Sequence, residues 1–160
     1  FIDTPGAYPG IESEERGMSE AIAKNLSLLS NLKTPVIVII TGEGGSGGAL
    51  AIGVGDHVCM LEHSIYAVAS PEACASIVWR DGSKAKDAAE AMKVDASSLQ
   101  NLGLVDQVIK EPLGGAHRDL RGVSNSISQV IEEKLLTFDE IDISDLLDKR
   151  YEKIMSYGSI

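Results

Sequence analysis

The chain has 160 residues, of which 44% are hydrophobic, and this is enough for a single domain with a real core. Its formal net charge of -10 argues against nucleic acid and against an anionic membrane surface as partners. No apolar run approaches the ~20 residues of a membrane-spanning helix. Cys59 and Cys74 lack the spacing of a disulfide framework, which favours a reducing, cytosol-like compartment.

The apolar pattern predicts strands that alternate with helices, an order typical of an α/β fold with a partly parallel sheet. The expected strands cover residues 36–41, 57–61, 65–69 and 104–109. The expected helices cover residues 12–32, 48–54, 71–79, 84–92, 96–103, 116–136 and 144–157, with Asp95 as a cap and Gly103 as a stop. Residues 1–2 are typical of the end of a strand, so we expect a piece of a longer chain. No internal repeat is visible.

Five glycines lie within the seven residues from Gly42 to Gly48, between a predicted strand and a predicted helix. A turn so rich in glycine lets the backbone come very close to a ligand. It also directs several N–H groups at one point, at the positive end of a helix. Fixed donors of this kind can stabilise a developing negative charge without a side chain. A tight turn needed only for packing is the alternative, and the number of glycines favours function.

A dinucleotide-binding turn is one competing interpretation of this segment. Gly42, Gly44 and Gly47 match the GxGxxG fingerprint, and Glu62 lies where a ribose contact is expected. The following helix is short for an ordinary crossover, which counts against it. The sequence has no P-loop. Residues 1–6 are similar to the DTPG switch segment of GTPases, but no guanine-reading motif follows.

A nucleophile elbow is the other competing interpretation. Residues 44–48 satisfy GxSxG, with Ser46 as the nucleophile. Asp106 and His117 follow in the chain order of a catalytic triad, although both residue types are too common for this order to carry weight. The three histidines and two cysteines show no ligand spacing, so we expect no metal in this chain. Cys59, in an apolar run, is expected to be a small core residue.

Several segments together resemble the alpha subunit of the acetyl-CoA carboxylase carboxyltransferase. They are residues 1–10 (FIDTPGAYPG), 14–17 (EERG), 42–56 (GEGGSGGALAIGVGD), 70–72 (SPE), 111–118 (EPLGGAHR) and 155–158 (MSYG). Residues 102–109 also resemble a strand entry of the wider crotonase superfamily. The resemblance implies an α/β fold of the crotonase/ClpP-like type, a spiral of ββα units followed by C-terminal helices. Residues 1–160 would then be one carboxyltransferase domain, truncated at its N-terminal side.

The family's reaction moves a carboxyl group from carboxybiotin, borne on a carrier protein, to acetyl-CoA and so forms malonyl-CoA, the first step of fatty acid synthesis. The resemblance implies a site shared with a beta subunit that holds the CoA thioester and carries zinc. It also implies a biotin carboxyl carrier protein and biotin carboxylase as partners, and an alpha2beta2 assembly. The expected location is cytoplasmic, in a bacterial cytosol or a plastid stroma.

Carried onto this sequence, the resemblance assigns the N–H groups of Gly47 and Gly48 to the ureido oxygen of biotin, which gains negative charge as the carboxyl group leaves. The expected substrate-binding residues are Gly44, Gly45, Ser46, Gly6, Ala7, Tyr8, Pro71 and Glu72. Residues 3–10 would form one wall of the biotin cleft. Glu72 is expected to be a first-turn acid of its helix rather than a general base.

Other positions stay open at this stage. His117 and Arg118 have either a structural role or a role at an interface or site. Lys149, Arg150 and Lys153 are expected on a solvated or interface face, and residues 132–148 on the surface.

Two other functions remain alternatives. An acyl-CoA hydratase or isomerase of the crotonase type needs a carboxylate base beside the oxyanion site, for which Glu43 and Glu72 are the nearby candidates. An interaction module without activity is the third possibility.

Overall fold

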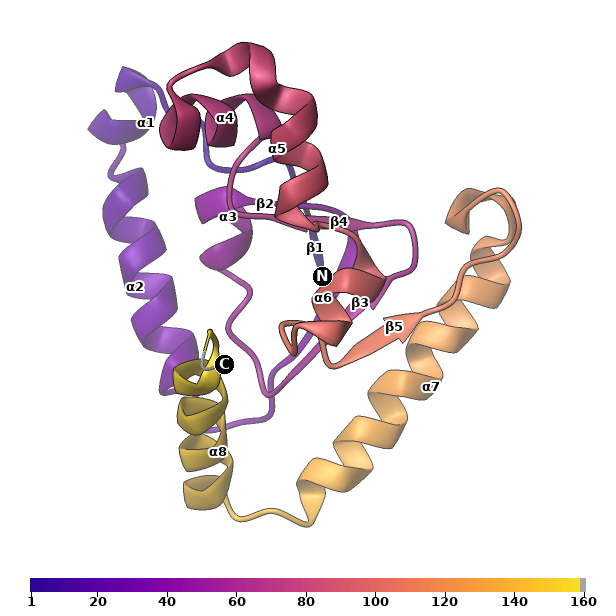
Figure 1. Cartoon of the computed structure of the whole chain (residues 1–160). Coiled ribbons are helices and arrows are strands. Elements are labelled where there is room, and N and C mark those ends of the chain that lie inside the picture. The colour runs from indigo at the N-terminus through magenta and orange to yellow at the C-terminus, as the bar shows by residue number, and fades with distance from the viewer. Residues whose placement is uncertain (159–160) are drawn as a thin grey trace.

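The computed structural model of the chain describes residues 1–158 (Figure 1). Its elements, in chain order, are β1 (Ile2–Thr4), α1 (Ile11–Glu15), α2 (Met18–Ser30), β2 (Ile37–Gly45), α3 (Ser46–Leu50), β3 (His57–Leu61), β4 (Ile65–Ala67), α4 (Pro71–Trp79), the 3₁₀ turn η1 (Gly82–Lys84), α5 (Ala85–Met92), α6 (Ala96–Asn101), β5 (Gln107–Ile109), the 3₁₀ turn η2 (Ala116–Arg118), α7 (Leu120–Asp139) and α8 (Ile143–Ser156). This order confirms the predicted α/β class. None of the helices within residues 1–158 is long and apolar enough to cross a membrane.

The strands form a parallel sheet in the order β1-β2-β3-β5, and β4 also pairs with β2. The long strand β2 changes partner along its length, because residues 37–40 pair with β3 and residues 43–45 pair with β4. Its register with β1 shifts at the same place, where Ile2 lies opposite Ile40 but Thr4 lies opposite Gly44. An advance of two residues along β1 therefore corresponds to an advance of four residues along β2. The extra residues form a bulge in β2, and a bulge bends its strand.

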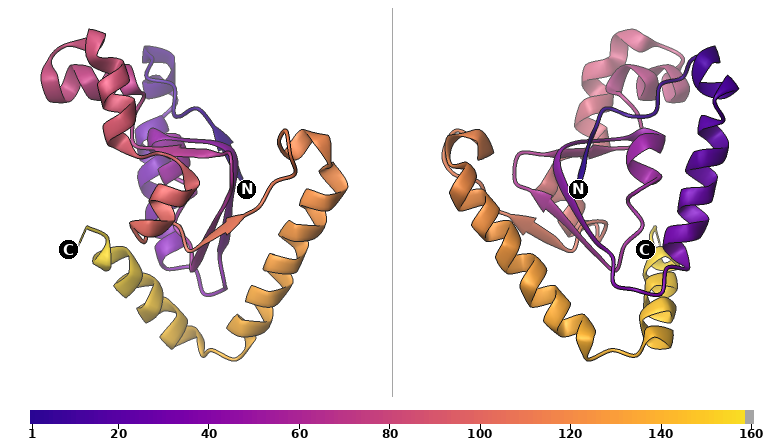
Figure 2. Two further views of the ribbon diagram at one scale, coloured as in Figure 1. Left: turned by 45° about the vertical axis from the view of Figure 1, so that its right-hand side comes forward. Right: turned by 180° about the vertical axis from the view of Figure 1, so that it is seen from behind.

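Two apolar clusters cover the two faces of β2 and β3, as expected for parallel strands that are buried on both sides. One cluster contains Ile2, Val38, Ile40, Val58 and Met60 together with Ala96 and Leu99 of α6. The other contains Ile39, Cys59, Leu61 and Ile109 together with Val123 and Val130 of α7. Cys59 is fully buried, and burial raises the pKa of its thiol to about 11, which confirms it as a core residue. Helices α7 and α8 diverge as a V, with α7 against the sheet (Figure 2).

Several predicted ends of helices and strands are wrong, and these errors lie at or near glycines. The helix expected over residues 12–32 is two helices, because Gly17 has a φ of +74° and separates α1 from α2. The strand expected to end at Thr41 continues to Gly45, because β4 supplies a pairing partner for its last residues. The following helix accordingly begins at Ser46 and is shorter than expected. The predictions for α6 are confirmed, with Asp95 accepting from the N–H of Ser98 (3.0 Å).

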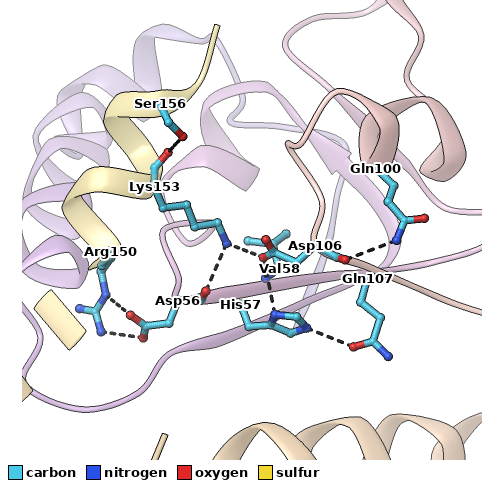
Figure 3. A network of polar contacts seen from close by, with 9 residues as sticks. All are labelled: Asp56, His57, Val58, Gln100, Asp106, Gln107, Arg150, Lys153 and Ser156. Atoms are coloured by element: carbon cyan, nitrogen blue, oxygen red, sulfur yellow. Dashed lines mark hydrogen bonds and ion pairs between the residues drawn. The ribbon is translucent and has the colours of Figure 1, made fainter. Parts of the chain in front are cut away.

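Arg150 contradicts the expectation of a solvated or interface position, because only 1% of it is exposed. Its guanidinium donates through Nε and Nη2 to the two carboxylate oxygens of Asp56 (2.8 and 2.7 Å). The remaining donors reach the carbonyl oxygens of Leu29 (2.7 Å), Leu32 (2.9 Å) and Thr34 (2.9 Å). All five N–H groups of this side chain are therefore satisfied. The contacts join α8 to the end of α2 and to the residue that precedes β3 (Figure 3).

Asp56 and Asp106 make matching contacts one strand apart. The N–H of Asp56 donates to the carbonyl of Val36 (2.8 Å), and its carboxylate accepts from the N–H of Val36 (2.7 Å). Asp106 repeats both contacts with Val58 (2.9 and 2.7 Å). Each aspartate thereby clamps the start of its strand to the neighbouring strand of the sheet. The contacts show this repeat, but the sequence does not. The two segments share only an aspartate two residues before a valine, which is too little to predict it.

The other basic residues of α8 behave differently from one another. Lys153 donates to the carboxylate of Asp106 and to the carbonyl oxygen of Asp56 (3.2 Å), so it too is engaged within the fold (Figure 3). Lys149 is exposed, as predicted. The acidic stretch 132–148 is mostly exposed, although Leu146 is buried at 2% exposure.

Replacing Arg150 by Met is expected to lower the free energy of unfolding by about 3 kcal/mol or more, because the carboxylate of Asp56 loses its buried partner. Lys149→Met is the matched control, since it removes the same charge from an exposed position of the same helix and should change stability by about 0.5 kcal/mol or less. Urea titration followed by circular dichroism measures both. Equal unfolding midpoints for the two variants would contradict this role of Arg150.

Candidate functional site

The glycine-rich end of β2 forms one wall of a pocket of about 330 Å³. The pocket lies where β2 passes into α3. Residues 44–46 and Pro5 form one side of it, and Ser70 and Pro71 at the start of α4 form another. Ala67 of β4 and Ala89 and Met92 of α5 add apolar surface. The walls are thus mostly apolar, with the glycines of β2 at one side, as is common for sites that hold a small organic group.

The structure brings some of the predicted site residues together here and leaves others apart. Gly44, Gly45, Ser46 and Pro71 line the pocket. Gly6 and Ala7 lie beside it, because their backbone packs on the start of α3, and Gly47 and Gly48 continue from Ser46 in the first turn of that helix. Tyr8 is 72% exposed, and Glu72 is an exposed acid in the first turn of α4, as expected of its helix position.

Packing explains two of the glycines. A Cβ added to Gly45 would lie 2.1 Å from the carbonyl oxygen of Pro5, and one added to Gly48 would lie 2.7 Å from the carbonyl carbon of Gly6. Residues 5–7 therefore press backbone against backbone at the start of α3. At Gly47 the nearest atom would be Cδ1 of Ile22 at 3.5 Å, an ordinary contact. Crowding thus gives a reason for Gly45 and Gly48 but none for Gly47.

The helix α3 begins without a side-chain cap. Gly45 stands at the capping position, and within the described residues 1–158 no side-chain cap accepts from the first N–H groups of this helix. Such N–H groups have no partner within their own helix. Ser46 has a φ of +47°, a left-handed conformation that costs energy for a residue with a Cβ and that is often found at functional sites.

Tyr66 supports this segment from the neighbouring strand β4. An added Cβ at Gly44 would meet the Tyr66 ring at 2.8 Å, so the ring lies directly against the glycine. Burial raises the pKa of Tyr66, which keeps its hydroxyl protonated at neutral pH.

The residues of the nucleophile-elbow alternative do not form a triad. The carboxylate of Asp106 accepts from the N–H of Val58 and from Lys153, and it lies 3.7 Å from Nδ1 of His57. His117 lines a different pocket from Ser46. Within residues 1–158, no hydrogen bond joins Ser46, His117 and Asp106, so these three residues do not have the geometry of a triad.

The dinucleotide fingerprint is also an accidental match. Gly42 and Gly44 lie within β2 rather than in the turn before a helix. Glu62, the expected ribose contact, instead accepts from Lys110 (2.6 Å) and from the N–H of Glu111 (3.2 Å). Lys110 holds the pKa of the Glu62 carboxyl below its usual value.

A second pocket, of about 540 Å³, is lined by His117 and by residues 41–43 of β2. Glu111 also lines it and accepts from the N–H groups of His63 (2.9 Å) and Ala116 (2.7 Å). Glu43 lies on the border of both pockets, whereas Glu72 lines neither of them. Within residues 1–158, no cluster of three His, Cys, Asp or Glu side chains could hold a metal ion.

Comparison with known proteins decides the family. The family model for acetyl co-enzyme A carboxylase carboxyltransferase-like proteins matches residues 1–158. The chain belongs to this family. It is 57% identical over all of its 160 residues to the acetyl-coenzyme A carboxylase carboxyl transferase subunit alpha of Alcanivorax borkumensis, and 57% identical over 158 residues to that of Vibrio cholerae. The chain spans about half the length of each of these relatives, 50% in both cases.

Solved structures share the fold of this family member at low sequence identity. Transcarboxylase 12S matches 99% of this chain with 26% of its own (TM-score 0.60, 20% identity). A Pseudomonas malonate decarboxylase hetero-tetramer matches 93% of this chain with 59% of its own (TM-score 0.67, 19% identity). An enoyl-CoA hydratase/isomerase from Marinobacter aquaeolei matches 96% with 57% (TM-score 0.56, 17% identity). The predicted crotonase-like fold is thereby confirmed.

Two neighbouring glycines give a matched test of the close approach of residues 5–7. Gly48→Ala should destabilise the fold by about 1–3 kcal/mol, because its methyl group would collide with the backbone of Gly6. Gly47→Ala should change stability by about 0.5 kcal/mol or less, since its methyl group meets Ile22 at an ordinary distance. Thermal unfolding of both variants under one buffer measures the difference, and equal melting temperatures would refute the packing.

Proposed function

We propose that this chain is part of the alpha subunit of an acetyl-CoA carboxylase carboxyltransferase and supplies the side of the site that receives carboxybiotin. The match to the family along residues 1–158, with 57% identity to named alpha subunits, carries this proposal. The pocket beside the start of α3 supports it, because the glycine-rich end of β2 and a mostly apolar wall meet there, next to the first turn that contains Gly47 and Gly48. We further propose that residues 1–160 belong to one carboxyltransferase domain.

In the proposed reaction, the N–H groups of Gly47 and Gly48 donate to the ureido oxygen of carboxybiotin. That oxygen gains negative charge as the carboxyl group leaves, so donors that are already in place lower the barrier. Residues 5–7 hold the donors still by packing on the start of α3. Gly44, Gly45, Ser46 and Pro71 line the adjoining pocket, and Gly6 and Ala7 pack beside it on the start of α3. In this scheme Tyr8 and Glu72, which line neither pocket, would contact the substrate from the loop before α1 and from the first turn of α4. No side chain acts as a nucleophile in this scheme.

The partners follow from the same proposal. Acetyl-CoA is the acceptor, and a beta subunit that carries zinc would hold its thioester. A biotin carboxyl carrier protein would bring the carboxybiotin from biotin carboxylase. The word alpha in the names of the relatives supports a complex of several subunits, for which we propose an alpha2beta2 assembly in the cytoplasm of a bacterium or in a plastid stroma.

The proposed donors can be tested in the full-length subunit, assembled with its beta partner and supplied with carboxybiotin and acetyl-CoA. Gly47→Val should lower malonyl-CoA formation by about 10²-fold, because its branched side chain displaces one donor and blocks the approach to it. Gly47→Ala is the control for folding, since its methyl group has room. Ser46→Ala should keep activity within about tenfold, because the hydroxyl is not required.

Three results would count against this scheme. Near-normal malonyl-CoA formation by a folded Gly47→Val subunit would remove the donor hypothesis. Covalent labelling of Ser46 during turnover would show that Ser46 acts as a nucleophile. An assembled wild-type complex that forms no malonyl-CoA would exclude the proposed reaction itself.

A further inference from the structure

The bulge of β2 leaves a backbone amide that its strand ladder does not satisfy. Two residues of β1 span four of β2 at this point, so the regular pairing between Ile40 and Gly44 is interrupted. The N–H of Glu43 donates instead to Oδ1 of Asp3 (2.9 Å). The hydroxyl of Thr41 donates to the carbonyl oxygen of Ile2 (3.3 Å). Two side chains thus hold the bulge in place of backbone pairs.

A side chain at Gly42 would disturb this contact. A Cβ at Gly42 would lie 2.3 Å from Oδ1 of Asp3, so the carboxylate occupies the space that a side chain would need. The bulge is therefore built around the aspartate. Bulges of this kind are common beside active sites, where they direct the residues that follow.

The residues that follow the bulge are those of the candidate site. After it, β2 leaves β3 and pairs with β4 through residues 43–45. Residues 44–46 then line the pocket, and α3 begins at Ser46. On the other strand, residues 5–7, which press on Gly45 and Gly48, begin two positions after Asp3. Asp3 is thus close to both segments of this backbone contact: residues 5–7 follow it in the chain, and its carboxylate binds Glu43, just before the glycines of β2.

We propose that Asp3 is a positioning residue for the candidate site. Its carboxylate holds the bulge of β2, and through it sets the place of residues 44–48 against residues 5–7. It touches no substrate in this role. The part of the inference that concerns carboxyl transfer rests on the proposed function, whereas the part that concerns the bulge does not.

The test compares Asp3→Ala, Asp3→Asn and Asp119→Ala in the full-length subunit assembled with its partner. Asp119 is a matched control, because it accepts from the N–H of Gly122 at the same 2.9 Å, and a Cβ on Gly122 would meet its carboxylate at the same 2.3 Å. It caps α7, away from the pocket at the start of α3. Amide hydrogen exchange and steady-state malonyl-CoA formation are measured on each protein.

For Asp3→Ala we expect faster exchange at the amides of residues 43–48 and a fall in kcat of about tenfold, with the KM for acetyl-CoA within about twofold, because the donors are displaced and the thioester site is not. Asp3→Asn should remain within about threefold of the wild type, since its amide oxygen still accepts from Glu43. Asp119→Ala should speed exchange at the start of α7 only. Thr41→Val, which removes the second clamp, should act in the same direction as Asp3→Ala and replaces it if that variant does not assemble.

Unchanged exchange at residues 43–48 in Asp3→Ala would overturn the proposal, whatever the activity shows. A fall in kcat no larger than that of Asp119→Ala would overturn it as well, and so would equal losses in Asp3→Asn and Asp3→Ala. A wild-type complex that forms no malonyl-CoA would refute the proposed function alone, because the exchange measurement still decides whether Asp3 holds the bulge.

Discussion

The buried guanidinium of Arg150 is the contact on which the arrangement of this chain depends. It joins three segments that are far apart in the sequence, namely α8, the end of α2 and the residue before β3. A buried charge is costly unless it is paired and fully hydrogen-bonded. Here both carboxylate oxygens of Asp56 and three carbonyl oxygens meet that requirement. Two of these carbonyls belong to the last residues around the end of α2, where a helix dipole favours a cation.

The effect of this contact reaches the candidate site through β2. Asp56 accepts from Arg150 and also from the N–H of Val36, directly before β2 begins. The far end of the same strand carries the bulge and then the glycines that line the pocket. One strand is therefore held at its start by a buried ion pair and at its end by the backbone of residues 5–7. Because both ends are held, the backbone at the start of α3 has a defined place.

The fold was largely predictable where a local pattern decides the structure. Apolar runs revealed β3 and the core position of Cys59, and Asp95 marked the start of α6. The errors lie where a distant partner decides. Nothing near Thr41 in the sequence shows that β4 will pair with residues 43–45 and so extend β2. Arg150 has the spacing of an exposed helical residue, and distant partners such as Asp56, 94 residues away, make its burial favourable.

The sequence by itself determined the alternation of strands and helices, the presence of an unusual glycine-rich segment and, through its resemblance to a family, the crotonase-like fold. These depend on residue type and short spacing, which are local properties. Only the tertiary structure argued against two of the three motifs that this segment matches. It placed Gly42 and Gly44 inside a strand, separated Ser46 from His117, and pressed residues 5–7 against Gly45 and Gly48. Those outcomes depend on backbone contacts between segments about 40 residues apart. A sequence pattern does not show how close such segments lie in space.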